Sequence, residues 1–174
     1  MKQVKWFDRK FSFGQSENTF PSIMERLSGT PIRLEEKVSE LTDEALVYSE
    51  DSTWSIKENI GHLTDLEPLW QGRLNDILGN KGELREADLE NSITHQANHN
   101  AQPVTELLAA FRRVRQETTA MLADLEDDAI LKSAIHPRLK IPMRTIDLFL
   151  FVAEHDDHHL ARISALINKL KTTN

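Results

Sequence analysis

The sequence predicts an all-α protein, a bundle of four long helices. Leu, Glu, Ala and Arg are abundant and aromatic residues make up only 6% of the chain, a composition that favours helix. Four segments repeat apolar residues at intervals of three and four, and no segment shows the strict alternation of a strand. Two long polar connections separate these segments, so we expect a bundle whose topology is not simply up-down-up-down.

The length of 174 residues suits one domain. Residues 1–16 mix aromatic and basic side chains, and we expect them to form an irregular arm on a bundle that spans residues 17–174. The first helical region is predicted from Glu17 to Leu41. It contains Gly29, after which a Thr and a Pro read as a second helix start, so a break or kink is expected there.

The second helix has the clearest signals. Ser55 and Glu58 form a capping box, in which each residue satisfies a backbone amide of the other. Apolar residues then recur at helical spacing as far as Gly79, where the helix is expected to end. Pro68 removes one backbone donor inside this helix and predicts a local kink.

A long polar connection, residues 80–102, follows. Connections of this length are unusual inside a compact domain and are often functional or cross between distant helix ends. Pro103 opens the third predicted helix. Residues 127–140 form a second connection, and Pro142 is expected to start a fourth helix that runs to about Lys171.

Composition excludes several functions. Cysteine is absent, so there is no disulfide and no thiolate ligand, and a metal would need nitrogen and oxygen donors. The formal net charge is −7 with scattered basic residues, which argues against nucleic acid and against a membrane surface. Neither a secretory signal nor an apolar run long enough to cross a bilayer is present, so we expect a cytoplasmic protein.

The histidines carry the chemistry. His155 and His159 are one helical turn apart, separated by roughly 40° around the predicted fourth helix, on the stripe that also holds Val152 and Ile163. Zinc-binding HxxxH pairs use this spacing. His158 falls on the neighbouring flank, which we interpret as the wetter side.

His62 is the best third ligand, because it lies at the edge of the apolar face of the second helix. The pattern alone leaves two readings open: a metal site, or core histidines held by hydrogen bonds. His95 and His99 share the i, i+4 spacing, but they lie in the polar connection, where we expect them to be solvated. His136 precedes a proline and is interpreted as a loop residue.

The sequence also resembles the DinB/YfiT-like superfamily of metal-dependent enzymes. Two motifs carry the resemblance, residues 54–63 with Asp65 and Glu67, and residues 154–163. Residues 24–27 with Thr30 and Pro31, and residues 111–115, are similar to the first and third helices of the family. The match covers nearly the whole chain from about residue 17, and the combination is more specific than any one piece.

This resemblance implies an up-up-down-down four-helix bundle. It also implies a divalent metal, often zinc or nickel, bound at the positions of His62, His155 and His159, the residues that the helical faces favour. Some members of the family resemble S-transferases or isomerases that use a low-molecular-weight thiol such as bacillithiol, mycothiol or glutathione. Others are described as hydrolases.

Three imidazoles leave an open metal position, as catalytic sites do. Our leading hypothesis is transfer of a small thiol to an electrophilic small molecule, with hydrolysis of a small substrate as the alternative. A helical bundle with a structural metal or a binding role is the non-enzymatic alternative. Asp156 and Glu58 lie near the predicted ligands as candidate orienting groups or bases, but we assign no catalytic base. A homodimer is also expected to be possible for such a bundle.

Overall fold

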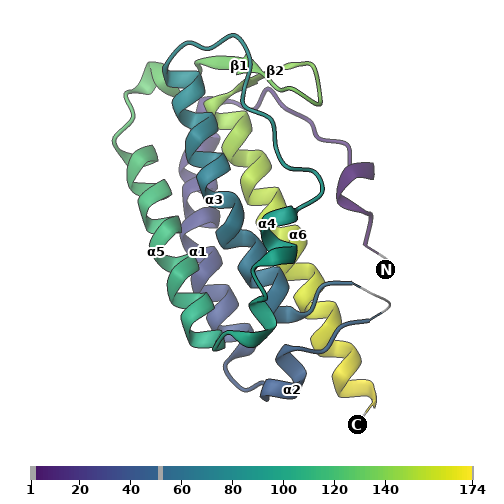
Figure 1. The fold of residues 1–174 in the computed structure, drawn as a ribbon. Helices are drawn as coiled ribbons and strands as arrows, with labels where there is room; N and C mark the ends of the chain where they lie inside the picture. The colour runs from purple at the N-terminus through teal and green to yellow at the C-terminus, as the bar shows by residue number, and fades with distance from the viewer. Residues whose placement is uncertain (1–2, 51–52, 174) are drawn as a thin grey trace.

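Four long helices form a bundle: α1 (Phe20–Val38), α3 (Ile56–Leu78), α5 (Val104–Ala123) and α6 (Thr145–Thr173) (Figure 1). The structure is a computed structural model and describes residues 3–50 and 53–173; residues 1 and 2 of the expected arm lie outside this part. The prediction of an all-α four-helix bundle is confirmed. The short elements are α2 (Asp43–Leu46), α4 (Ser92–Gln96), strands β1 (Ser133–Ile135) and β2 (Pro142–Arg144), and the 3-10 turns η1 (Trp6–Asp8), η2 (Glu17–Thr19), η3 (His99–Ala101) and η4 (Asp127–Ile130).

The helix directions in chain order are up, down, down, up (Figure 1). Helix α1 packs on α5 and α6, and α3 packs on the same two helices. Along the contact between α1 and α6 the residue numbers of both helices increase in the same direction, from the Arg26–Glu154 ion pair to the Lys37–Ser164 hydrogen bond. These two helices are therefore parallel. Helices α3 and α5 are also parallel. This order differs from the expected up-up-down-down, because only the first long connection, residues 79–103, crosses the length of the bundle.

The core consists of two clusters of buried side chains. One lies around Leu27, Trp70 and Phe149, and the other around Leu34, Phe111 and Ile163. Both clusters draw residues from all four long helices. The apolar stripes predicted from the sequence therefore meet along the bundle axis, and burial of this surface is the main force that holds the helices together.

Helix α1 is continuous through Gly29, so the prediction of a break or kink at this position is wrong. Thr30 does not cap a new helix: its hydroxyl donates to the Arg26 carbonyl and to Asp156. Pro31 has no amide hydrogen for the Leu27 carbonyl one turn earlier. Arg115 of α5 donates to that carbonyl at 3.4 Å, which helps the helix tolerate an internal proline.

Helix α3 begins and ends where the sequence predicts. The Ser55 hydroxyl accepts from the Glu58 amide at 3.1 Å, and the Glu58 carboxylate accepts from the Ser55 amide at 2.8 Å. The helix ends at Leu78 with Gly79 as its C-cap, and Pro68 is accommodated inside it. The capping box fixes the start of the helix two turns before His62, so it sets the height of this residue in the bundle.

The start of the fourth helix also differs from the prediction. Pro142 does not open it but begins β2, which pairs with β1 in an antiparallel hairpin. Helix α6 begins at Thr145, where the Asp147 carboxylate accepts from the Arg144 amide at 3.2 Å and caps the first turn. The two strands have three residues each, too few for an alternating pattern to be visible in the sequence.

The N-terminal segment crosses the outside of the bundle beside α6. The Trp6 ring lies 4.9 Å, centroid to centroid, from both Phe11 and Phe151. Gln3 donates to the His158 carbonyl at 2.9 Å. These contacts place the segment over the middle of α6, at the level of the histidines. No helix in the described residues is both long and apolar enough to cross a membrane.

Candidate metal centre

The structure brings His62, His155 and His159 together inside the bundle. One nitrogen atom of each ring lies within 4.8 Å of the others, and all three residues are buried. The His62 ring centroid is 5.3 Å from that of His155 and 4.8 Å from that of His159. Helix α3 contributes the first and α6 the other two, because their antiparallel packing aligns these turns. No other His, Asp or Glu among the described residues joins this group.

Asn59 orients the ring of His159. The Asn59 side-chain amide donates to the backbone carbonyls of Trp54 and Ser55, which leaves its oxygen as the acceptor. That oxygen lies 2.8 Å from Nδ1 of His159, so Nδ1 carries the proton. The free lone pair of this imidazole is therefore on Nε2, toward the other two rings.

A second relay orients His62. Its Nδ1 lies 3.1 Å from the hydroxyl of Thr94, which itself donates to Asp65 at 2.7 Å. Because the hydroxyl hydrogen is used for the carboxylate, the hydroxyl accepts from Nδ1, and Nε2 of His62 is unprotonated. His99 contacts the same Asp65 oxygen at 2.9 Å. Gly61 makes room for this ring, since a Cβ there would collide with His99.

His155 completes the group. Its Nε2 lies 3.2 Å from Nε2 of His159. Two nitrogen ligands on one tetrahedral zinc, each about 2.05 Å from the ion, are about 3.3 Å apart, so the spacing suits a shared ion. Nδ1 of His155 is buried without a hydrogen-bond partner among the described residues. The rings of Trp6 and Trp70 pack edge-on against it at 4.9 and 5.9 Å.

Burial keeps the three rings neutral. It lowers the pKa of His62 to about 3, and nearby basic groups, His99 first, add to this effect. Burial also lowers the pKa of His155 and His159 well below the usual range, followed by the effect of the neighbouring histidines. Neutral imidazoles are the form that binds metal. The donor set, its protonation and its spacing therefore fit a divalent transition metal.

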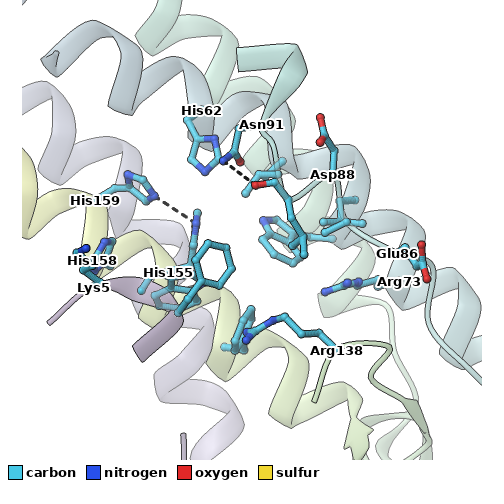
Figure 2. A pocket seen from close by; sticks show the side chains of 18 of the residues that line it. Lys5, His62, Arg73, Glu86, Asp88, Asn91, Arg138, His155, His158 and His159 are labelled. Atoms are coloured by element: carbon cyan, nitrogen blue, oxygen red, sulfur yellow. Dashed lines mark hydrogen bonds between the residues drawn. The ribbon is translucent and has the colours of Figure 1, made fainter. Parts of the chain in front are cut away.

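The three imidazoles form part of the wall of a cavity of about 680 Å³ (Figure 2). All three tryptophans of the chain, Trp6, Trp54 and Trp70, line this cavity. The cavity has the size and the aromatic lining of a small-molecule site. A metal held by the three histidines would thus face a space that admits a small molecule.

The remaining histidines differ from expectation in two cases. His158 is buried rather than on a wetter flank, because Gln3 and Trp6 cover it; Gln3 Nε2 lies 3.0 Å from its Nδ1. His99 is buried against α3 rather than solvated. His95 is exposed as predicted, and His136 lies in a turn, where it is buried.

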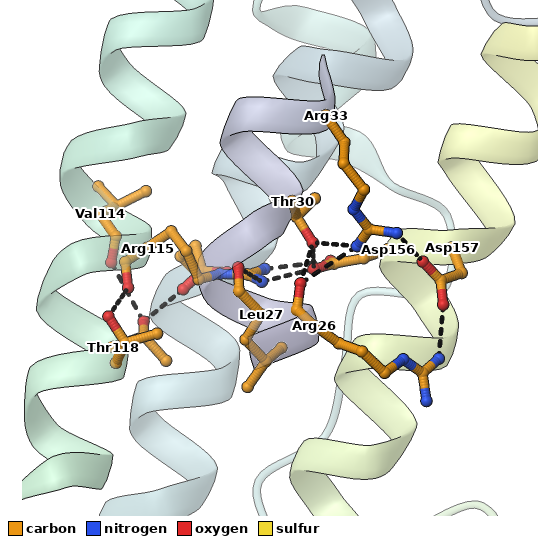
Figure 3. Close-up of polar contacts among 11 residues, drawn as sticks. Arg26, Leu27, Thr30, Arg33, Val114, Arg115, Thr118, Asp156 and Asp157 are labelled. Carbon is orange, nitrogen blue, oxygen red and sulfur yellow. Dashed lines mark hydrogen bonds and ion pairs between the residues drawn. The ribbon is translucent and has the colours of Figure 1, made fainter. Parts of the chain in front are cut away.

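Asp156 and Glu58 both point away from the site. Asp156 faces α1 and α5, where Arg115 donates to it at 2.5 Å, and the same guanidinium donates to Glu67 at 2.6 Å (Figure 3). Thr118 also donates to Glu67. Glu58 is occupied by the capping box. The structure therefore gives neither carboxylate a role as a base at the histidines.

Comparisons with known proteins agree with this arrangement. A model of the DinB superfamily matches residues 26–163. No curated protein matches the chain. Among solved structures, YfiT from Bacillus subtilis, described as a probable metal-dependent hydrolase with an unusual four-helix bundle topology, is similar with a TM-score of 0.81 and 23% identity over 94% of each chain. The family match covers most of the chain and includes all three histidines, so the protein belongs to the DinB superfamily.

Proposed function

We propose that this protein is a metal-dependent enzyme that acts on a small molecule. In this proposal His62, His155 and His159 bind one divalent transition metal through their Nε2 atoms. The observation that carries it is the convergence of three buried, neutral imidazoles on the wall of a cavity. The description of YfiT as a probable metal-dependent hydrolase supports the same general activity. Zinc or nickel suits a site of imidazole ligands.

We favour thiol transfer as the reaction. When bound, the metal supplies a Lewis acid with an open position, which lowers the pKa of a thiol or of a water molecule there. A free thiol has a pKa of about 8.5 and a water molecule one of about 15.7, so the thiol needs less help to lose its proton. In the reaction the proton passes to solvent and the sulfur forms a bond to an electrophilic carbon. The electron pair of the broken bond goes to the displaced group or, in an epoxide or a quinone, to an oxygen that stays on the product and takes a proton from solvent.

The carboxylates of the cavity favour this choice over hydrolysis. Within the described residues only Glu86 and Asp88 line the cavity as acids, and both are exposed. The Asp88 carboxylate already accepts from the backbone amides of Glu90 and Ser92. Hydrolysis often uses a carboxylate beside the attacking water, and these two acids are exposed. The histidines His136 and His158, which also line the cavity, are the alternative bases for hydrolysis. Hydrolysis of a small substrate remains the second candidate, because YfiT carries that description.

Elemental analysis tests the metal site. The purified protein is expected to hold close to one equivalent of zinc or nickel, and the variants His62→Ala, His155→Ala and His159→Ala are expected to lose it. His95→Ala is the matched control, because His95 is exposed and outside the group. If all three variants keep the metal of the unmodified protein, the ligand assignment is wrong.

A second assay distinguishes the reactions. Metal-loaded protein is incubated with glutathione, bacillithiol or mycothiol and a panel of epoxides and quinones, and separately with esters in the absence of thiol. Thiol adducts that disappear in His155→Ala support transfer, and ester cleavage supports hydrolysis. A metal that raises the melting temperature without turnover of any substrate favours the non-enzymatic alternative. A cytoplasmic location and a homodimer remain predictions, the second open to measurement by light scattering.

A further inference from the structure

The end of the cavity away from His62, His155 and His159 holds a buried cation that forms no ion pair with any described residue. Arg73 of α3 is only 2% exposed. Its Nε donates to the Arg85 carbonyl at 3.1 Å, and its guanidinium carbon lies 5.6 Å from the Trp70 ring centroid. Among the described residues no carboxylate oxygen lies within 4.0 Å of it; the nearby Asp76 is instead bonded to Lys81 and Arg85. Buried charges are usually paired, because desolvating one alone is costly.

The neighbour of Arg73 adds a second unsatisfied donor. Nδ1 of His136 accepts from the backbone amides of Arg138 at 3.1 Å and Leu139 at 3.2 Å. Nδ1 is therefore unprotonated, and the neutral ring carries its proton on Nε2. That Nε2 lies 3.3 Å from Nη1 of Arg73, which always carries protons. Two N–H groups thus face each other, and neither can accept from the other.

The charged groups that act on His136 are both positive. Arg138 also lines the cavity, and its guanidinium lies over the Phe7 ring at 5.2 Å without an ion pair to a described residue. Arg73 and Arg138 both help burial to lower the pKa of His136 to about 4, so this ring is neutral near pH 7. The other charged groups of the lining are Lys5, Arg162, Glu86 and Asp88. The two acids are exposed, and the Asp88 carboxylate accepts from the backbone amides of Glu90 and Ser92.

We propose that Arg73 and His136 form an oxyanion site that binds a carboxylate or phosphate group of the ligand in this cavity. One oxygen beside both residues accepts from the guanidinium and from Nε2–H at once, which removes the conflict between the two donors. A fork-shaped guanidinium suits a two-oxygen acceptor. That the ligand is also the substrate of the metal centre rests on the function proposed above.

The spacing to the histidines describes the rest of the ligand. Trp70 is close to both sites: its ring centroid lies 5.6 Å from the guanidinium carbon of Arg73 and 5.9 Å from the ring centroid of His155. The oxyanion site and the metal centre therefore share one aromatic neighbour. Trp6, Phe151 and Leu66 add apolar surface to the same cavity. The ligand class is thus a small anionic molecule whose apolar body, about one ring long, lies between its anionic and reacting ends.

Binding of matched probes tests the oxyanion site without any turnover. The probes are 3-phenylpropionate, its uncharged analogue 3-phenylpropionamide, and phenyl phosphate. Tryptophan fluorescence reports binding, because all three tryptophans line the cavity. The protein is used both metal-loaded and after removal of metal with a chelator. The variants are Arg73→Gln, Arg73→Lys and, as a control, Arg112→Gln, which loses an arginine paired with Glu35 on the outer surface.

We expect the unmodified protein to bind at least one anionic probe about 10- to 100-fold more tightly than the amide, the range for a hydrogen bond to a charged group. Arg73→Gln is expected to bind anion and amide equally, Arg73→Lys to keep part of the preference, and Arg112→Gln to keep all of it. The tighter of the two anions identifies the oxyanion. Equal binding of anion and amide by the unmodified protein, or an unchanged preference in both Arg73 variants, overturns the proposal.

Two measurements separate this proposal from the metal centre. The preference for the anion is expected to persist in metal-free protein, and Arg73→Gln is expected to retain the metal content of the unmodified protein. If instead His155→Ala keeps its metal while the anion preference holds, the metal assignment is wrong and the oxyanion site stands. If Arg73→Gln does not fold, Arg73→Lys still tests the proposal. Lysine lacks the fork-shaped guanidinium, so its preference for the anionic probe over the amide must be smaller than that of the unmodified protein.

Discussion

Replacement of Arg115 by Met tests whether the buried ion cluster stabilises the bundle as a unit. Arg115 is 1% exposed and holds two carboxylates, each no more than 1% exposed: Glu67 of α3 and Asp156 of α6. Methionine is unbranched and flexible and fills much of the same space. The change therefore removes the charge and leaves little cavity. Afterwards Glu67 keeps the hydroxyl of Thr118, and Asp156 keeps that of Thr30, as their remaining side-chain donors.

The expected loss is large because two buried carboxylates are left without a cation. Removing one partner of a buried ion pair typically costs about 3–5 kcal/mol. Domains of this size have a free energy of unfolding of about 5–15 kcal/mol, so the variant is expected to fold at 25 °C. Each kcal/mol shifts the melting temperature by about 2–4 °C at this length. The melting temperature of Arg115→Met is therefore expected to fall by about 6–20 °C.

The stability of Arg115→Met is also expected to depend on pH in a way that identifies the cause of its loss. Burial raises the pKa of Glu67 even beside Arg115. Without this cation the pKa rises further, so the folded variant keeps a proton that the unfolded chain has lost between about pH 5 and 7. The free energy of unfolding of Arg115→Met is therefore expected to fall as pH rises. The difference in this free energy between the unmodified protein and the variant is expected to become smaller as pH drops from 7 toward 5.

Urea unfolding at pH 7 and pH 5, followed by circular dichroism, is the assay. Arg112→Met is the control: Arg112 and its partner Glu35 are both only half-buried, and an ion pair open to solvent contributes about 0–1 kcal/mol. The triple change Arg115→Met, Glu67→Leu, Asp156→Leu is expected to recover most of the loss, because no unpaired charge remains buried. A loss in Arg115→Met no larger than in Arg112→Met, with no pH dependence, refutes the reasoning.

Two further predictions concern the histidines. Thr94→Val removes the hydroxyl that orients His62, so metal affinity measured by competition with a chelator is expected to drop about 10–100-fold; Thr119→Val, whose hydroxyl donates only to carbonyls of its own helix, should leave it unchanged. In metal-free protein the pKa of His62 is about 3 against 6.5 for the free side chain, because burial disfavours the charged form. Unfolding then takes up a proton at His62 in this range, so His62 alone should lower the free energy of unfolding by up to about 1.4 kcal/mol per pH unit below pH 6.5, and the other buried histidines add to this slope. His62→Asn should reduce this slope in urea titrations and His95→Asn should not; an equal slope in all three proteins contradicts the assignment.

The sequence predicts the helices well, because their signals are local. The capping box at Ser55 and the apolar period lie within the segments that they define. The helix directions depend on which bundle ends the connections join, and no local pattern records this. The continuous α1 was missed for a similar reason: Pro31 is tolerated with help from Arg115, a residue of another helix that donates to the carbonyl left free.

In the candidate site, too, features set by one helix were predicted, and features that depend on another element were not. His155 and His159 share a helical face, and their convergence with His62 was predicted. His99 was expected in solvent, because its burial depends on Gly61 of a different element. His158 is covered by the N-terminal segment, which its own helix does not reveal. Arg73 has a signal in the sequence itself: it lies one turn after Trp70 on an otherwise buried face of α3.

The order of the ligands along the chain has a consequence for biosynthesis. His62 leaves the ribosome early, whereas His155 and His159 follow only after α5 and the hairpin have been translated. With the proposed ligand set, a single imidazole on α3 cannot hold an ion that needs three, so uptake would wait until α6 has docked. Metal loading would then be a late step of maturation, open to control through the supply of the ion.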